Sequence, residues 1–543
     1  MKALLAIILV FFIACCSLGC ISKSSEANLD DHRTNKTNII LLMGDDHGWE
    51  ETGYNGHPFL KTPVLDDMAK NGMVLDKFYS AHPSCSPTRG SIITGRHPNR
   101  YGTFTPGWSI RPEEISLAQL IKDKGYATAH FGKWHLGPVK ATSPTNPGAM
   151  GFDTWVSHDN FFEMDPMLSR NGAPPIKMEG EGSEVVIDET ISFISDSKKR
   201  DIPFFTVVWF GSPHEPYQAL PEDLALYKNL PDSLGNTLVG LTSLKTGTRV
   251  NRPLDSVLQE RFAEITAMDR AIGKLRNYLK KEGIRDNTLI WYCGDNGIPP
   301  SGLYNSMFHG LKGTVYEGGT RVPGIIEWPE GISGPISSDV HTVTTDIFTT
   351  LAEVIGFELP DRPLDGISLI PVVQREMKER PKPICFWNFD ITHLTDTNQY
   401  IKPELQVGAT PLVKKSGDVF TRTFRNFHHK TIDEKDYSGD RAILDNRYKL
   451  VIANRNSELA KELYNIQDDP GETNNLIDDY PNIAVDLERQ MKVWQRSVLE
   501  SLMGKDYKVH RKIEKKQKSM IEGVCNWQPF LTIVFSLDFA RTQ

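Results

Sequence analysis

The sequence contains few cysteines, and they form no recognisable disulfide or zinc pattern. Seven occur in 543 residues, and three of them lie within the first twenty. The other four are scattered along the chain, and no two stand at the C-x-x-C spacing of a zinc site. A disulfide framework is therefore excluded, and the role of Cys85, which lies in SCSPTRGSIITGR (residues 84–96), has to be explained by other parts of the chain.

The chain also has no excess of positive charge, no internal repeat and no long low-complexity segment. Its formal net charge of -8 argues against nucleic acid as a partner, although a local basic pocket for an anionic substrate stays open. The 39% hydrophobic and 24% charged residues are typical of a soluble globular protein. The length predicts two to four domains, or one large domain with a satellite.

Its most apolar segment is too short to span a bilayer. Lys2 precedes ALLAIILVFFIA (residues 3–14), and small residues follow, so residues 1–20 are predicted to be a signal peptide and 21–36 a polar leader. The protein is expected to be exported, to the periplasm or the medium. The sequence SLGC ending at Cys20 partly resembles a bacterial lipoprotein cleavage site, so a surface lipoprotein anchored at Cys20 is the alternative, and no other membrane contact is predicted.

Four apolar runs in the first two thirds of the chain each end in polar residues, and three of them follow a helical pattern. Continuous apolar runs of this kind indicate strands buried on both faces. The alternation of helix, buried strand and polar cluster predicts an α/β fold, a mixed sheet flanked by helices. The four predicted strands lie within residues 38–46, 126–137, 203–216 and 288–297.

The pattern changes after a charged, proline-bearing segment at residues 372–383. Shorter strand patterns and one helical pattern follow, which predicts a smaller C-terminal α+β subdomain. The predicted organisation is a catalytic domain at 37–378, the subdomain at 379–510, and a tail at 511–543 to which no role is assigned.

The ends of the four strands carry the candidate site residues, because ligands of open α/β sheets bind at the carboxyl ends of strands. Two of these ends carry only oxygen ligands, which suit Ca²⁺ or Mg²⁺ rather than zinc. Each acidic pair alone would more often be a turn or a helix cap, but together they favour a metal site. The candidate ligands are Asp45, Asp46, Asp295 and Asn296.

A set of cationic side chains lies in turns rich in glycine and proline. Any one of them alone would be an ordinary surface residue, but a pocket of Lys, His and Arg beside a divalent cation suits a tetrahedral oxyanion. The set comprises Arg89, Lys133, His135, His214 and Lys312.

Cys85 is predicted to lie at the N-terminus of a helix, because Pro87 and Thr88 suit the first turn of a helix through GSIITG. That position lowers the pKa of a thiol, so a thiolate nucleophile is one interpretation. A buried structural cysteine is the other. Neither explains the spacing of Pro87 and Arg89.

This spacing resembles a known signature. The motif C-x-P-x-R followed by TGR, here Cys85 to Arg89 with Thr94 to Arg96, is similar to that of type I sulfatases, among them bacterial polysaccharide and glycosaminoglycan sulfatases. The resemblance extends from about Asn38 to Leu476. It includes the segments NIILLMGDDHGW, GYATAHFGKWHLG, SPHEPY, GDNG, KGTVYEGGTRVP, LDNRYKLV and ELYNIQDDPGETNNL.

The resemblance implies an alkaline-phosphatase-like fold and a sulfatase whose Cys85 is converted by a maturase to formylglycine (3-oxoalanine). The hydrated aldehyde attacks sulfur, the alcohol leaves, and the second hydroxyl expels sulfate as the aldehyde re-forms. One Ca²⁺ per chain would be bound by the four oxygen-ligand residues together with residue 85. Arg89 would stabilise the hydrate, and His214 would protonate the leaving alcohol. Lys133, His135 and Lys312 would hold the sulfate.

Three alternatives stay open beside this interpretation. A phosphatase of the same superfold is disfavoured, because two-zinc phosphatases carry Ser or Thr as nucleophile and more His ligands. Formylglycine-bearing phosphonate hydrolases share the cysteine motif. The third alternative is an inactive carbohydrate-binding relative. The export signal and the resemblance favour a sulfated carbohydrate substrate, in keeping with polysaccharide degradation. Its specificity is expected to reside in a rim formed by residues 140–180, 217–255 and 390–440.

Overall fold

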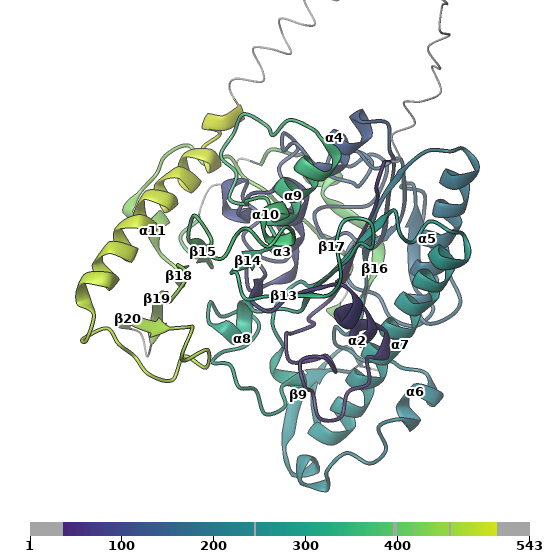
Figure 1. The fold of residues 1–543 in the computed structure, drawn as a ribbon, viewed down its shortest axis with the longest axis horizontal. Coiled ribbons are helices and arrows are strands. Elements are labelled where there is room, and N and C mark those ends of the chain that lie inside the picture. The colour runs from purple at the N-terminus through teal and green to yellow at the C-terminus, as the bar shows by residue number, and fades with distance from the viewer. Residues whose placement is uncertain (1–35, 244–245, 395–398, 417–418, 456–457, 508–543) are drawn as a thin grey trace, which may run out of the picture. The chain divides into compact units, whose positions relative to one another are not determined.

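The structure is a computed structural model, and it describes residues 36–243, 246–394, 399–416, 419–455 and 458–507 (Figure 1). The predicted signal peptide at 1–20, nearly all of the leader, Cys20 and the tail at 511–543 lie outside these residues. Within the described ranges, no helix combines the length and apolar character that crossing a membrane requires.

A ten-stranded mixed sheet forms the centre of the fold, in the order β13-β2-β12-β11-β1-β8-β4-β5-β6-β7. The five strands from β11 to β5 are parallel to their neighbours within this group, whereas β12 pairs antiparallel with β11 and β6 antiparallel with β5. The sheet comprises β1 (Asn38–Gly44), β2 (Met73–Leu75), β4 (Ala127–Lys133), β5 (Thr154–His158), β6 (Met167–Arg170), β7 (Ile176–Lys177), β8 (Phe204–Trp209), β11 (Thr288–Gly294), β12 (Gly324–Glu327) and β13 (Ile336–Ser338).

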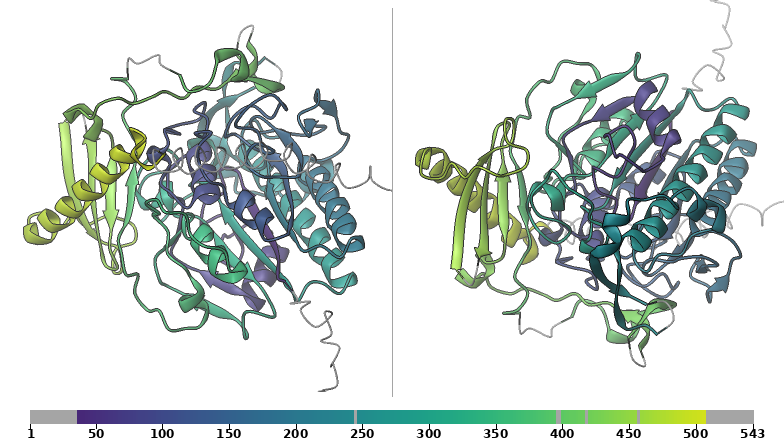
Figure 2. Two further views of the ribbon diagram at one scale, coloured as in Figure 1. Left: turned by 90° about the horizontal axis from the view of Figure 1, so that it is seen from above. Right: turned by 90° about the horizontal axis from the view of Figure 1, so that it is seen from below.

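Both faces of the sheet are buried, as the continuous apolar runs predicted. Along β1, Ile39 and Leu41 pack into one hydrophobic cluster, whereas Ile40 and Leu42 pack into a second cluster on the opposite face. Helices supply the rest of each cluster, and Figure 2 shows them on both sides of the sheet. The first face carries α3 (Cys85–Thr94), α4 (Leu117–Asp123), α9 (Asp346–Ile355) and α10 (Ile370–Val373), and the second α2 (Pro63–Asn71), α5 (Gly182–Lys199) and α7 (Leu254–Lys281).

A second, smaller sheet lies toward the C-terminus. It is antiparallel in the order β15-β18-β19-β20, and α11 (Pro481–Leu502) packs on it through Leu487 and Met491 (Figures 1 and 2). The large mixed sheet with flanking helices and the small antiparallel sheet with one helix confirm the predicted fold class. The four strands are β15 (Ile384–Trp387), β18 (Arg441–Leu444), β19 (Tyr448–Arg455) and β20 (Glu458–Asn465).

Apart from the two sheets and the helices packed on them, the described residues form three two-stranded pairings and two short α-helices. The pairings are β3 (Phe78–Tyr79) with β14 (Thr342–Val343), β9 (Leu238–Thr242) with β10 (Arg249–Pro253), and β16 (Val407–Ser416) with β17 (Val419–Thr423). The helices are α6 (Pro221–Ala225) and α8 (Glu317–Thr320).

The β16–β17 hairpin lies within the segment predicted as the C-terminal subdomain, yet it is bound to the large sheet. Asp159, one residue after β5, is buried and accepts hydrogen bonds from the backbone N–H groups of Ala409 and Thr410, at 2.6 and 2.7 Å. It also accepts the Thr410 hydroxyl at 3.0 Å and the Val139 N–H at 2.7 Å. One carboxylate thus fixes the hairpin beside the carboxyl end of β5.

A buried cluster of three charged residues joins the small sheet to the first residue of α8. Lys449 of β19 is fully buried and lies 2.9 Å from Glu317 and 3.0 Å from Glu472. Tyr79 donates a hydrogen bond of 2.9 Å to Glu317. Glu317 begins α8 five residues after Lys312, so this cluster also supports the segment that carries a candidate site lysine.

We expect Lys449→Met to lower the free energy of unfolding by about 3–5 kcal/mol, because it removes the buried cation that Glu317 and Glu472 share and leaves Glu317 only Arg321, at 3.6 Å. Chemical denaturation monitored by circular dichroism measures this loss. Lys461→Met is the matched control, because it removes an exposed lysine of the neighbouring strand β20 that pairs with Glu488 of α11, and it should cost less than about 1 kcal/mol. Equal losses in the two variants would show that the buried cluster does not stabilise the junction.

Candidate active site

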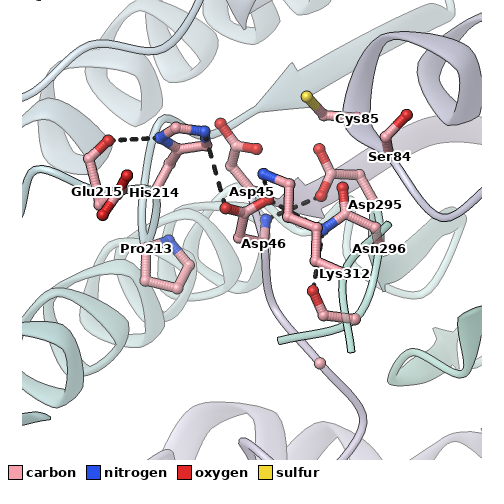
Figure 3. Close-up of polar contacts among 12 residues, drawn as sticks. Asp45, Asp46, Ser84, Cys85, Pro213, His214, Glu215, Asp295, Asn296 and Lys312 are labelled. Carbon is pink, nitrogen blue, oxygen red and sulfur yellow. Dashed lines mark hydrogen bonds and ion pairs between the residues drawn. The ribbon is translucent and has the colours of Figure 1, made fainter. Parts of the chain in front are cut away.

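The parallel strands bring the predicted site residues to one edge of the central sheet. Register pairs Gly44 of β1 with Gly294 of β11, so the acidic residues that follow the two strands emerge side by side. Lys133 ends β4, and the loop after β8 carries His214. Figure 3 shows side chains from these loops converging with the start of α3. All predicted site residues are buried except Lys312, which is partly buried.

Cys85 is the first residue of α3, where the sequence predicted a helix to begin. Its Sγ lies 3.5 Å from Nδ1 of His135. Ligand atoms of Cys85, Asp45 and Asp295 all lie within 4.8 Å of one another. The helix is buried along its whole length, and the Ser86 hydroxyl donates a hydrogen bond to the carbonyl of His135. Residue 85 is thus held between a carboxylate cluster and an imidazole.

Each of the three aspartates forms an ion pair with one cation of the predicted set. The distances are 2.6 Å between Arg89 and Asp295, 2.6 Å between Lys133 and Asp45, and 2.5 Å between Lys312 and Asp46. Arg89 also lies 3.5 Å from Asp45 and donates to the Lys133 carbonyl at 3.2 Å. The acidic and basic groups predicted from separate segments therefore form one network.

Burial and charge shift the pKa values of this network in different directions. Burial raises the pKa of Asp45 to about 7, and the neighbouring Lys133 only partly offsets it. Burial acts in the same direction on Asp46, but Lys312 and His214 outweigh it and hold the pKa of Asp46 well below its usual value. Burial lowers the pKa of His135 far below its ordinary value, helped by Lys133, so His135 is neutral near pH 7.

The acidic cluster fits a hard divalent cation. Asp45, Asp46, Asp295 and Asn296 offer only oxygen ligands. Within the described part of the chain, Oδ1 of Asp45 and Oδ1 of Asn296 are buried without a hydrogen-bond partner. Asn296 is oriented by the hydrogen bond that its amide donates to Asp46, at 2.9 Å. Two orphaned acceptors at one place are what a bound cation would satisfy.

His214 lies on the opposite side of the aspartates from Cys85 (Figure 3). Its Nδ1 is 2.6 Å from the carbonyl of Glu215, so Nδ1 carries a proton, and its Nε2 lies 3.7 Å from Asp46. The ring of Phe161 stacks on the imidazole, with 4.0 Å between centroids and 16° between planes. Stacking and hydrogen bonding together hold Nε2 toward the site, where it can exchange a proton with a bound substrate.

Sequence reasoning missed two arginines at the site. Arg261 of α7 donates to the backbone carbonyl of Asp46 at 2.6 Å and pairs with Glu51, which fixes the loop after β1. The sequence did carry one sign of this role: Arg261 lies on the apolar face of its helix, beside Leu258 and Phe262. Arg422 of β17 donates to Nε2 of His135 at 2.9 Å. It lies within a segment predicted only as rim, and nothing in its local sequence marks it.

Comparisons with known proteins identify one family, and solved structures share the fold. A family model described as Sulfatase matches residues 37–357. N-acetylgalactosamine-6-sulfatase of Mus musculus is 31% identical over 390 residues, which cover 63% of this chain and 68% of that protein. Among solved structures, Ps i-CgsB in complex with k-i-k-neocarrahexaose has a TM-score of 0.67 at 23% identity, covering 85% of this chain and 93% of its own. Phosphonate monoester hydrolase of Agrobacterium radiobacter shares the fold, with a TM-score of 0.59, 18% identity and coverage of 85% and 96%.

Proposed function

Because this chain belongs to the sulfatase family, we propose that it hydrolyses a sulfate ester on a carbohydrate, releasing the free hydroxyl and inorganic sulfate. The name of the mouse relative and the saccharide bound to Ps i-CgsB support a carbohydrate substrate. The observation that carries the proposal is Cys85. It begins a buried helix with the C-x-P-x-R spacing, and its sulfur lies within 4.8 Å of ligand atoms of Asp45 and Asp295 and 3.5 Å from Nδ1 of His135.

Residue 85 is proposed to act as formylglycine, whose hydrate supplies the nucleophilic hydroxyl. In this structure it is an unmodified cysteine, and Sγ stands in for a side-chain oxygen of the modified residue. All ten residues of Cys85–Thr94 are buried. A maturase therefore has to reach Cys85 before α3 packs into the core, and export through the predicted signal peptide fits such early processing.

Calcium is the proposed metal, held by Asp45, Asp46, Asp295 and Asn296, and when bound it polarises the sulfate and neutralises developing charge. Arg261 keeps the backbone of Asp46 in place for this role. These residues bring negative charge to one side of residue 85. The cations Arg89, Lys133 and Lys312 lie beside the same aspartates and add positive charge next to the metal site.

Lys133, His135 and Lys312 are proposed to bind the sulfate oxygens, and Arg89 to orient residue 85 through its contacts with Asp295 and the Lys133 carbonyl. His135 is neutral, and its Nδ1 faces residue 85. His214 presents Nε2 to the site, and from there it can protonate the alcohol oxygen as the ester bond breaks.

The oxygen-only donor set disfavours a two-zinc phosphatase, whose ligands would include several imidazoles. Phosphonate and phosphate monoesters remain the chemical alternative, because they present the same tetrahedral anion to the same cations. An inactive carbohydrate-binding relative would have no need for the full set of site groups.

An assay of purified, matured protein against sulfated oligosaccharides, an aryl sulfate and a phosphonate monoester tests the proposal. We expect sulfate release from at least one oligosaccharide, with kcat/KM at least about tenfold above that for the aryl sulfate, because sugar contacts add binding in the transition state. Hydrolysis of aryl sulfates alone would refute the carbohydrate substrate. Preferred hydrolysis of the phosphonate would refute the sulfatase assignment, and absence of all turnover with modified residue 85 would support an inactive relative.

A further inference from the structure

Arg422 is a further, partly buried cation at the site, and it differs from three of the others. Arg89, Lys133 and Lys312 each form an ion pair with an aspartate. No carboxylate among the described residues lies within ion-pair distance of Arg422, and its hydrogen bond goes to the neutral ring of His135, at 2.9 Å. Arg261 pairs with Glu51, so Arg422 is left as a site cation that no described carboxylate neutralises.

Asp159 is the carboxylate whose charge acts on Arg422, and it is already engaged elsewhere. Asp159 attracts Arg422 electrostatically, but its carboxylate already accepts four hydrogen bonds from Val139, Ala409 and Thr410. Burial lowers the pKa of Arg422, because the guanidinium has lost water without gaining a counter-ion among the residues that the structure describes. An unpaired, desolvated charge is costly, so an anion that enters the site would be stabilised there.

Geometry separates Arg422 from the position of the reacting group. His135 faces Sγ of Cys85 with Nδ1 and faces Arg422 with Nε2, so the imidazole ring stands between them. There is open space beside the guanidinium, because a Cβ placed on Gly107 would meet Arg422 Nη1 at 3.9 Å and no other heavy atom within 4 Å. Arg422 is thus available to a part of the substrate beyond the scissile ester.

We propose that Arg422 binds a second anionic group of the substrate, a carboxylate or a further sulfate next to the ester that is cleaved. A guanidinium offers two parallel N–H donors that match either group. Asp159 sets its position by fixing the β16–β17 hairpin to the end of β5. This inference rests on the proposed function and narrows its substrate to a saccharide that carries at least two negative charges.

The test compares wild type, Arg422→Gln and Arg422→Lys on matched saccharides. One carries a single sulfate and no other anion, a second adds a carboxylate to the same saccharide, and a third adds another sulfate. For Arg422→Gln we expect kcat/KM to fall about 30–100-fold on one doubly anionic saccharide, mainly through KM, and only a few-fold on the singly sulfated one and on an aryl sulfate. Arg422→Lys keeps the charge without the paired donors, so its kcat/KM on that saccharide should lie between those of wild type and Arg422→Gln.

Arg425→Gln is the matched control, because it removes the same charge two residues beyond β17, at an exposed arginine that covers Trp108 at 4.6 Å. Its kinetics should equal those of wild type. Equal losses on all sulfate esters in Arg422→Gln would place its action at the scissile sulfate or on His135, and would overturn the proposal. A wild type that does not prefer either doubly anionic saccharide would also overturn it. A wild type that cleaves no sulfate ester would instead refute the proposed function.

Discussion

Replacing Cys85 with alanine is expected to lower the turnover of sulfate esters by at least about 10⁴-fold, because it removes the nucleophile that all other site residues serve. The fold should survive, since only one buried sulfur atom is lost from the start of α3. Sulfate release under saturating substrate, with thermal denaturation of the same preparation, measures both quantities.

Cys385→Ala provides the comparison, because it removes a half-buried thiol from β15, on the small sheet. It should retain the kcat of wild type. Activity in Cys85→Ala close to that of Cys385→Ala would refute the assignment of residue 85 as nucleophile. Loss of folding in Cys85→Ala alone would instead show a structural role, and circular dichroism separates the two results.

Removal of the bound metal is expected to lower kcat by about 10³-fold, and Ca²⁺ should restore it whereas Zn²⁺ should not. The oxygen-only donors and the orphaned oxygens of Asp45 and Asn296 are the reason. Saturation with Ca²⁺ should also raise the midpoint of thermal unfolding, since at about 100 times its Kd a ligand adds about 2.7 kcal/mol. Activity and thermal melts after chelation and re-addition measure both effects.

Asp295→Ala should lose both the restoration of activity by Ca²⁺ and the rise in melting midpoint that Ca²⁺ causes, because it removes a metal ligand and the ion-pair partner of Arg89. Asp165→Ala, which removes an exposed carboxylate paired with Lys177, should keep both. Full activity in chelator, with an unchanged melting midpoint on adding Ca²⁺, would contradict the metal site.

The parts of this fold that sequence patterns predicted are those set by local rules. Apolar runs of strand length marked β1, β4, β8 and β11, and the carboxyl ends of such parallel strands have to share one edge. Polar residues that directly follow those runs, such as Asp45 and Asp295, could therefore be placed together before the structure was known. The motif around Cys85 added the family, which the comparisons confirmed.

Other features depend on contacts that no local pattern encodes. The hydrogen bond between Arg422 and His135 joins residues 287 positions apart, and it exists because Asp159 binds a hairpin that follows the small sheet's first strand. The pairing of Lys449 with Glu317 joins residues 132 positions apart, and it affects stability because both side chains are buried. The start of α7 at Leu254, a few residues before its amphipathic pattern becomes clear, reflects packing of its first turn.

The mass of the tryptic peptide Phe78–Arg89 from active enzyme tests the central claim most directly, because Lys77 and Arg89 bound a fragment in which Cys85 is the sole cysteine. We expect a peptide lighter than the unmodified sequence by the difference between a thiol and an aldehyde, together with loss of reaction toward thiol reagents. Fully active enzyme whose peptide retains an unmodified Cys85 thiol would contradict the account.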